Sequence, residues 1–361
     1  MSRLADQWDN DDVRVRPSKR SRPRSKIRPR HSEAATGFVV AVNRGRYQCL
    51  VDEDGPDERM VTAMRARELG RRAIAVGDRV ELVGDTSGDK DTLARVVRIN
   101  KRRSELRRSA DDAVDTVSGT GDGPDPAASG AEKVLVANAD LLVIVTAAAD
   151  PPPRTGFIDR CLVAAYAGGL QAVLVVTKAD LADPSDLVAA YRDLTVAVVV
   201  SRRERSAGKA LADGAVAELR ELLRGKVSVL VGHSGVGKST LVNALVPDAD
   251  RATATVSGVG KGRHTSTNAV ALRLPARRKR SRGDGWVVDT PGVRSFGLAH
   301  VTNDDVLSAF DDLAPGAAQC PPGCDHLGPA CALDGYVATG HSSPERLASF
   351  RRLLLSRTGT G

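Results

Sequence analysis

The stretch Gly232-His-Ser-Gly-Val-Gly-Lys-Ser239 decides the fold of this chain. It follows a short apolar run at residues 226–231 and precedes residues 240–245, whose apolar positions have helical spacing. A glycine-rich segment between a strand and a helix wraps its N–H groups around phosphate oxygens, and the helix N-terminus adds partial positive charge. The pattern therefore predicts a nucleotide phosphate site on an α/β sheet. A glycine-rich turn without a ligand is the alternative.

Each residue type in this loop has a predicted role. The glycines at 232, 235 and 237 allow the backbone to approach phosphate closely. Lys238 is placed to reach the β and γ oxygens as a catalytic cation, and Ser239 offers a hydroxyl ligand to Mg²⁺. The whole loop is predicted to contact the nucleotide, through Gly232, His233, Ser234, Gly235, Val236, Gly237, Lys238, Ser239 and Thr240.

A second motif, Thr177-Lys178-Ala179-Asp180, selects the base. It follows the apolar run 172–176, and a carboxylate such as that of Asp180 accepts both N–H donors on the Watson–Crick edge of guanine, a pattern that adenine lacks. Alone, such a motif is also typical of a solvated turn that caps a helix. Together with the phosphate loop it favours a guanine nucleotide. Ser201, after the apolar run 195–200, resembles the start of the Ser-Ala loop that supports the base in GTPases, although Arg202 here replaces the alanine.

A third motif, Asp289-Thr-Pro-Gly292, follows the apolar run 286–288. We expect Asp289 to hold Mg²⁺ through water and the Gly292 N–H to contact the γ-phosphate. Valine follows Gly292, so the glutamine with which Ras-like enzymes orient the attacking water is missing from its usual loop. His264, in the stretch Gly262-Arg-His-Thr-Ser-Thr267, is the candidate to orient or deprotonate that water. An ordinary surface histidine is an equal alternative.

The motif order is permuted, because Ras-like GTPases place the phosphate loop first and the guanine motif last. This order, the segment at 262–267 and a following Cys/His cluster resemble the ribosome small-subunit-dependent GTPase A family, the circularly permuted YjeQ-type GTPases. The resemblance covers residues 36–355 and includes the stretches at 136–140 and 158–160. Switch I of that family usually reads His-Thr-Thr-Thr, and here Ser266 takes the middle position. Which hydroxyl binds Mg²⁺ therefore stays open among Ser266 and the two predicted ligands, Thr265 and Thr267.

The resemblance implies a multidomain fold: an N-terminal all-β OB barrel, a central α/β P-loop GTPase domain with permuted motifs, and a C-terminal α-helical zinc-binding domain. The expected boundaries are a disordered basic arm at 1–35, the OB-fold at 36–106, a flexible linker at 107–133, the GTPase domain at 134–298 and the zinc domain at 299–361. The resemblance also implies hydrolysis of GTP to GDP and phosphate in late maturation of the small ribosomal subunit. Ribosome-stimulated activity and nucleotide-dependent subunit binding belong to that expectation.

The cluster Cys320, Cys324, His326 and Cys331 predicts one structural Zn²⁺, because three thiols and an imidazole close a tetrahedral coordination sphere. Disulfides or free thiols are the alternative. They are disfavoured because the chain has five cysteines, of which the other two stand alone, and nothing suggests export.

The net charge is 53 − 45 = +8, and the basic residues are distributed unevenly along the chain. Residues 14–30 contain Arg and Lys without an acid, which predicts a disordered arm that contacts rRNA phosphates, or else a solubilising tail. Short β-rich runs at 37–42, 47–51, 80–83 and 93–99 predict a small barrel, either RNA-binding or purely structural. No signal peptide or membrane-length apolar run is visible. We expect a cytoplasmic monomer without membrane contact.

Two other function classes stay open. One is an RNA-binding assembly factor that uses GTP only as a conformational switch and turns it over negligibly until a partner binds. The other is an ATP-dependent kinase or ATPase, which Asp180 opposes.

Overall fold

The computed structural model describes residues 31–43, 45–70, 72–108, 133–203, 213–247, 249, 269–276, 284–290, 296, 298 and 300–357. The basic run at 14–30, most of the predicted linker, His264 with its segment, and Gly292 lie outside the described residues. The chain divides into two compact units, residues 1–32 and 33–361, and the architecture below belongs to the second.

The first five strands form a closed barrel. Neighbouring strands pair in the order β1-β2-β3-β5-β4, and β4 pairs back with β1. Apolar side chains that alternate along these strands fill the interior, for example Val39, Cys49, Val61 and Leu82. The predicted OB-like barrel is thus confirmed, with β1 (Ala35–Asn43), β2 (Arg46–Val51), β3 (Arg59–Arg65), β4 (Arg79–Gly84) and β5 (Ala94–Ile99). A 3-10 turn, η2 (Arg67–Leu69), follows β3.

The third barrel strand had no counterpart among the predicted runs. Its sequence, Arg-Met-Val-Thr-Ala-Met-Arg, buries only Val61 and Ala63 and keeps methionine and charged residues on the outside. A strand half exposed to solvent carries polar residues at alternate positions, so it lacks the continuous apolar run that marked its neighbours.

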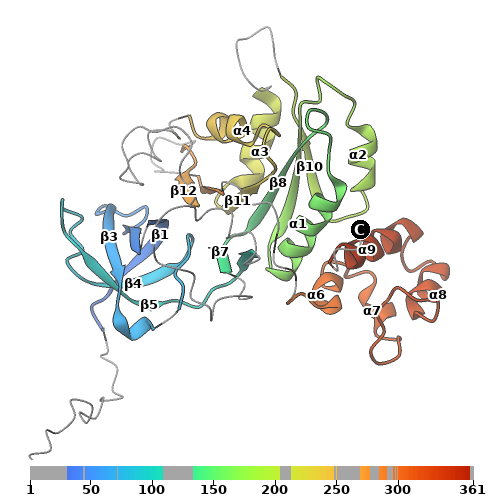
Figure 1. Ribbon diagram of the computed structural model, residues 1–361, viewed down its shortest axis with the longest axis horizontal. Coiled ribbons are helices and arrows are strands. Elements are labelled where there is room, and N and C mark those ends of the chain that lie inside the picture. Colours follow the sequence, from blue (N-terminus) through green and yellow to red (C-terminus); the bar gives the residue numbers. More distant parts are fainter. Residues whose placement is uncertain are drawn as a thin grey trace, which may run out of the picture. The chain divides into compact units, whose positions relative to one another are not determined.

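The central domain is a parallel sheet extended by one antiparallel strand. Its order is β10-β9-β8-β11-β13-β12, and only the β13–β12 pairing is antiparallel. The strands are β8 (Leu141–Ala147), β9 (Gln171–Thr177), β10 (Val196–Val200), β11 (Val227–Val231), β12 (Val270–Arg273) and β13 (Trp286–Asp289). Helices α1 (Thr155–Ala167), α2 (Ser185–Ala190), α3 (Asp213–Leu223) and α4 (Lys238–Leu245) surround it (Figure 1).

A small ladder joins the barrel to this sheet. Strand β6 (Glu105–Arg108) pairs with β7 (Lys133–Ala137), and the Ala137 N–H donates to Val76 O at 2.9 Å. Asn138 extends the junction, because its amide donates to Gly77 O and accepts from the Arg103 N–H, both at 2.9 Å. Gly77 has φ +90°, and a Cβ there would lie 2.0 Å from Ala137 O, so only glycine fits.

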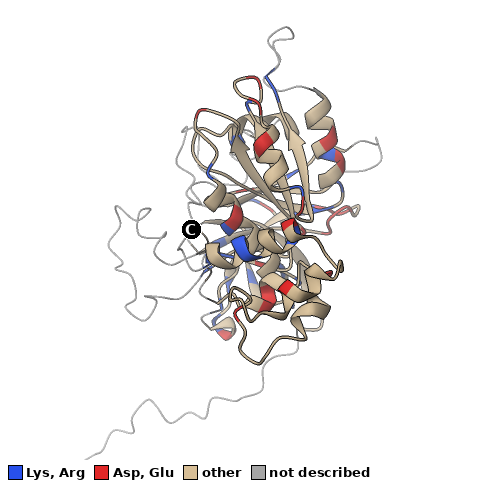
Figure 2. Ribbon diagram, turned by 90° about the vertical axis from the view of Figure 1, so that its right-hand side faces the viewer, with Lys and Arg blue, Asp and Glu red and all other residues tan. Residues whose placement is uncertain are grey.

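The C-terminal region is helical. Thr302 caps α6 (Asn303–Leu307) in a reciprocal capping box with Asp305, and α9 (Pro344–Arg357) ends the described chain. Two short helices, α7 (Ala314–Ala317) and α8 (Ala332–Ala338), were not predicted, because each is too short to show helical periodicity. Figure 2 shows acidic and basic residues interspersed over these C-terminal helices.

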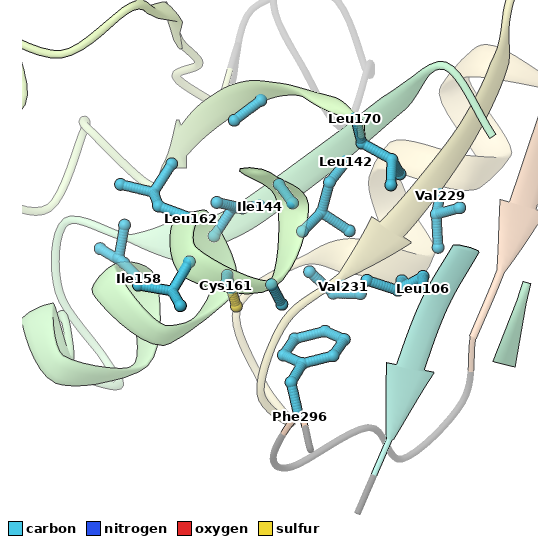
Figure 3. Close-up of a cluster of buried hydrophobic side chains, with 14 of the residues drawn as sticks. Leu106, Leu142, Ile144, Ile158, Cys161, Leu162, Leu170, Val229, Val231 and Phe296 are labelled. Carbon is cyan, nitrogen blue, oxygen red and sulfur yellow. The ribbon is translucent and has the colours of Figure 1, made fainter. Parts of the chain in front are cut away.

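One hydrophobic core runs from the central sheet into the C-terminal helices. It contains Ile144 of β8, Leu162 of α1 and Phe350 of α9. Phe296, between β13 and α6, points into the same cluster beneath Val231 (Figure 3). None of the described helices is long and apolar enough to cross a membrane.

Candidate active site and metal centre

The predicted nucleotide motifs meet at one edge of the central sheet. The guanine motif ends β9, Ser201 follows β10, the phosphate loop follows β11, and Asp289 is the last residue of β13. These four strands are mutually parallel, so their carboxyl ends lie on the same side. Crevices at the carboxyl ends of parallel strands are where open α/β sheets bind ligands.

The phosphate loop has the backbone shape that its glycines predict. Gly235 and Gly237 have φ +85° and +89°, and Gly237 is the N-cap of α4. A Cβ on Gly232 would lie 2.6 Å from Val145 O. Lys238, Ser239 and Thr240 form the first turn of α4, with the last two exposed. The N–H groups of the loop and of that turn are therefore available to an anion.

Thr177 connects the guanine motif to the phosphate loop. Its side chain is buried, and its hydroxyl lies 2.6 Å from Val236 O and 3.1 Å from Thr146 O. The hydroxyl thus bridges β9, β8 and the phosphate loop. Thr177 was predicted to contact the nucleotide. In this geometry its side chain fixes the distance between the segments predicted to bind the base and the phosphates.

The remaining residues of the base site surround the end of β9. Lys178 has φ +56° and its ammonium contacts Asp150 O. Asp180 is exposed, and its Oδ1 accepts from the Arg203 N–H at 3.0 Å. Ser201 is 1% exposed and its Oγ has no hydrogen-bond partner within the described part of the chain. Its backbone N–H donates to Val176 O at 2.8 Å, which holds the two loops together.

The charged groups of the phosphate side lie together. The Lys238 ammonium forms an ion pair with the Asp289 carboxylate, and their side chains are 12% and 30% exposed. Thr290, next along the chain, is buried and donates to Leu230 O at 2.7 Å, so the end of β13 is fixed to the strand that precedes the phosphate loop. The structure thus brings together Lys238 and Asp289, the residues predicted to contact phosphate and Mg²⁺.

His233 is the second residue of the phosphate loop. Its ring packs on Phe157 in the first turn of α1, with centroids 4.1 Å apart. Burial, assisted by the nearby Arg154 charge, lowers the His233 pKa. The imidazole is therefore neutral at physiological pH and contributes packing to the loop. Sequence analysis had no signal for Phe157, because a helical aromatic residue is indistinguishable there from ordinary core.

The predicted zinc ligands converge. The ligand atoms of Cys320, Cys324, His326 and Cys331 all lie within 4.8 Å of one another. The Cys320 and Cys331 sulfurs are 3.7 Å apart, and they lie 3.6 and 3.7 Å from His326 Nδ1. Zn–S bonds of about 2.3 Å at tetrahedral angles give S···S edges of about 3.8 Å, so this donor set fits zinc. The sulfurs are too far apart for a disulfide.

The backbone conformation and nearby hydrogen bonds position these ligands. His326 has φ +62°, and its N–H donates to Cys324 Sγ at 3.4 Å. Arg351 of α9 donates from Nε to His326 O at 2.9 Å and pairs with Asp334 of α8 at 2.7 Å. Burial raises the pKa of the Cys331 thiol, so a bound cation is needed to favour its thiolate at neutral pH.

The chain matches known proteins over most of its length. The RsgA GTPase family profile matches residues 124–299. The small ribosomal subunit biogenesis GTPase RsgA of Chlorobaculum parvum is 34% identical over 332 residues, covering 90% of this chain and 98% of that protein. Its namesake from Pseudomonas aeruginosa strain LESB58 is 38% identical over 297 residues, covering 80% and 77%.

Two crystal structures have a similar fold. YjeQ from Thermotoga maritima is 25% identical, with a TM-score of 0.58, and the match covers 90% of this chain and 99% of that one. The structure of YloQ, described as a circularly permuted GTPase, gives the same TM-score at 21% identity and covers 93% and 99%. The sequence match to the Chlorobaculum parvum relative thus spans most of both chains. The chain therefore belongs to the RsgA GTPase family and is a GTP hydrolase.

Proposed function

We propose that this GTPase acts in late maturation of the small ribosomal subunit, binding the subunit and its rRNA according to the nucleotide it holds. The observation that carries the proposal is the joined site: Thr177 ties the guanine motif to a phosphate loop whose Lys238 pairs with Asp289. The printed names of the relatives, which describe small-subunit biogenesis GTPases, support the choice of partner.

In this proposal the chemistry is attack of water on the γ-phosphate of GTP. Asp180 selects guanine, Lys238 and the loop N–H groups stabilise charge on the phosphates, and Gly292 contacts the γ-phosphate. Ser239 and Asp289, with Thr265 or Thr267, would hold Mg²⁺. That ion neutralises charge on the β- and γ-phosphate oxygens when bound. His264 orients the attacking water.

The C-terminal domain would respond to the state of this site. Residues 290–302 connect Asp289 to α6, and along them Phe296, Leu298 and Val301 are buried in the common core. A change at the end of β13 that displaces these side chains must therefore be accommodated by the C-terminal helices, because packed cores do not deform continuously.

The direct test is co-sedimentation with purified small and large subunits in GDP and in a non-hydrolysable GTP analogue. We expect binding to the small subunit that differs between the nucleotides and weakens as salt rises, since the barrel and basic arm contact phosphate. Equal binding in both nucleotides, or preference for the large subunit, would overturn the proposal.

Single-turnover hydrolysis with and without small subunits tests the stimulated activity. We expect His264→Ala to lose most of the stimulated rate while keeping GTP affinity and subunit binding. Negligible turnover of the wild type with subunits present would favour the alternative, an RNA-binding factor that uses GTP only as a switch. The cytoplasmic location, the monomeric state and the domain boundaries at 35, 106, 133 and 298 stay predictions.

A further inference from the structure

The barrel and the nucleotide-binding sheet share strand pairing. Ala41 of β1 pairs with Val270 of β12, and Val270 pairs with Asp289 of β13. Asp289 in turn pairs with Leu230 of β11, which leads into the phosphate loop. One row of backbone partners therefore runs from the barrel to the phosphate side of the active site. The barrel lies two strands away from Asp289.

The antiparallel strands β12 and β13 form a hairpin, with Val270 and Asp289 at one end and Arg273 and Trp286 at the other. An acidic loop of the barrel contacts the end with Arg273 and Trp286. The loop, residues 52–58 between β2 and β3, reads Asp-Glu-Asp-Gly-Pro-Asp-Glu. Arg273 of β12 donates to both carboxylate oxygens of Glu58, at 2.9 and 2.8 Å, and also contacts Asp54. Trp286 of β13 donates from Nε1 to Glu53 Oε1 at 2.7 Å. Arg273 and Trp286 are direct partners in the β12–β13 ladder.

The contacts form a partly buried network. Trp286 is 8% exposed, and the side chains of Arg273 and Glu58 are 20% and 14% exposed. The Trp286 ring lies 5.0 Å from that of Phe38 in the barrel, and the Arg273 guanidinium lies 5.3 Å from the Trp286 ring centroid. Nη1 of Arg273 donates both hydrogen bonds to Glu58, and a partly buried ion pair of this kind holds geometry better than an exposed one. The hairpin is therefore fixed to the barrel at this end.

Strand β13 is short, and its two ends make different contacts. Trp286 is anchored on the barrel, whereas Asp289, three residues or about 10 Å further along, faces Lys238. In the interactions given above, the partners of Arg273 and Trp286 are residues of the barrel and of the β12–β13 ladder. We therefore expect them to act on the nucleotide through the position of β13.

We propose that Arg273 and Trp286 are positioning residues for GTP hydrolysis, which hold Asp289 in register by clamping the β12–β13 hairpin on the acidic loop of the barrel. The inference rests on the proposed role of Asp289 toward Mg²⁺. It makes the barrel part of the catalytic framework, and it predicts that disturbing the clamp acts on Mg²⁺ use more than on binding of the guanine base.

The test uses Arg273→Ala in the full chain, with Arg98→Ala as the matched control. Arg98 also forms a barrel ion pair, with Glu81 at 2.8 Å, but it is 57% exposed and lies away from the hairpin. For Arg273→Ala we expect the Mg²⁺ concentration for half-maximal single-turnover hydrolysis to rise about 5-fold, at the low end of coupling between protein sites. GDP affinity without Mg²⁺ should stay unchanged. Arg98→Ala should match the wild type in both measurements.

A second measurement does not depend on hydrolysis. The chain has two tryptophans, Trp8 and Trp286, so Trp8→Phe makes Trp286 the sole indole. We expect its emission to differ between the GDP state and the state with Mg²⁺ and a GTP analogue. Adding Glu53→Gln, which keeps an acceptor but removes the charge, should reduce that difference. Identical emission in the two nucleotide states would overturn the proposal.

The outcomes separate this inference from the role of Asp289 itself. Asp289→Asn should impair Mg²⁺-dependent hydrolysis in either case. If Asp289→Asn is impaired while folded Arg273→Ala and Trp286→Phe have wild-type Mg²⁺ dependence, the clamp is structural only and the inference fails. Thermal unfolding of each variant establishes that it is folded at the assay temperature. If Arg273→Ala does not fold, Trp286→Phe, which keeps one aromatic ring but loses the N–H donor and the second ring of the indole, decides the matter.

Discussion

The zinc cluster and the nucleotide site are built in opposite ways. All four zinc ligands come from residues 320–331, and a few turns of backbone bring them within 4.8 Å. The nucleotide residues come from four parallel strands and span positions 177 to 289. The geometry of a chelating cluster therefore depends on the spacing of its ligands along the chain, whereas a phosphate and base site depends on the order of strands in a sheet. Perturbing the first should unfold a region, and perturbing the second should change a reaction.

The largest effect should follow loss of zinc. We expect one Zn²⁺ per chain, and Cys324→Ser should unfold the C-terminal helices, because structural zinc supplies about 10–16 kcal/mol in small zinc domains. Metal analysis, circular dichroism and limited proteolysis check this. Cys49→Ala, in the barrel core, is the control that should retain the metal. GDP binding should largely survive in Cys324→Ser; its complete loss would show that the two regions are not independent.

Next in size is the removal of the phosphate-side cation. Lys238→Ala should lower the single-turnover rate about 10²- to 10³-fold, the usual effect of deleting one group that stabilises transition-state charge. Zinc content and the unfolding temperature of the C-terminal region should not change. A rate within a few-fold of the wild type would mean that Lys238 does not contact the transferred phosphate.

The third prediction concerns Asp180, the residue expected to recognise guanine. The substitution Asp180→Asn turns an acceptor of two N–H groups into a mixed donor and acceptor, so guanine affinity should fall about 10- to 100-fold, the value of a charged hydrogen bond or two. Xanthosine triphosphate, whose edge matches the amide, should bind better than it does to the wild type. Competition binding measures both changes, and unchanged GTP affinity would contradict the assignment of this loop.

The smallest effect concerns the contact between the two regions. Arg352 of α9 lies 3.2 Å from Asp159 of α1, whose carboxyl is 4% exposed. Burial raises the Asp159 pKa, against the opposing effects of Arg352 and a hydrogen bond from Tyr191. A carboxyl with a raised folded-state pKa contributes stability below its unfolded pKa and loses it as pH rises through the folded value.

Asp159→Asn cannot take up that proton. The variant should therefore be destabilised more, relative to the wild type, near pH 4.5 than near pH 7.5, as denaturant unfolding at the two pH values would show. A destabilisation that is larger at pH 7.5 would mean that the ion pair with Arg352 outweighs burial. In either case zinc content and GTP affinity should be retained.

Residue types and short spacings were enough to predict much of this molecule. The glycines at 235 and 237, the strand before them and the helix after them specify a phosphate loop, because only that backbone shape uses this pattern. The zinc ligands were predicted for a similar reason, and the capping box at Thr302 and Asp305 is equally local. Short elements such as β3 and α8 escaped prediction, because β3 has no continuous apolar run and α8 is too short to show helical periodicity.

The residue types and their spacing along the chain were enough to predict which groups bind phosphate, guanine and zinc, since those predictions depend on side-chain chemistry and on contacts between near neighbours. Only the tertiary structure decided that Thr177 bridges to Val236, that Asp159 meets Arg352, and that Arg273 and Trp286 rest on the barrel's acidic loop. Those partners are far apart along the chain, and their pairing follows from strand order and packing. Local patterns carry no record of such pairing, because many distant residues have the same charge or shape.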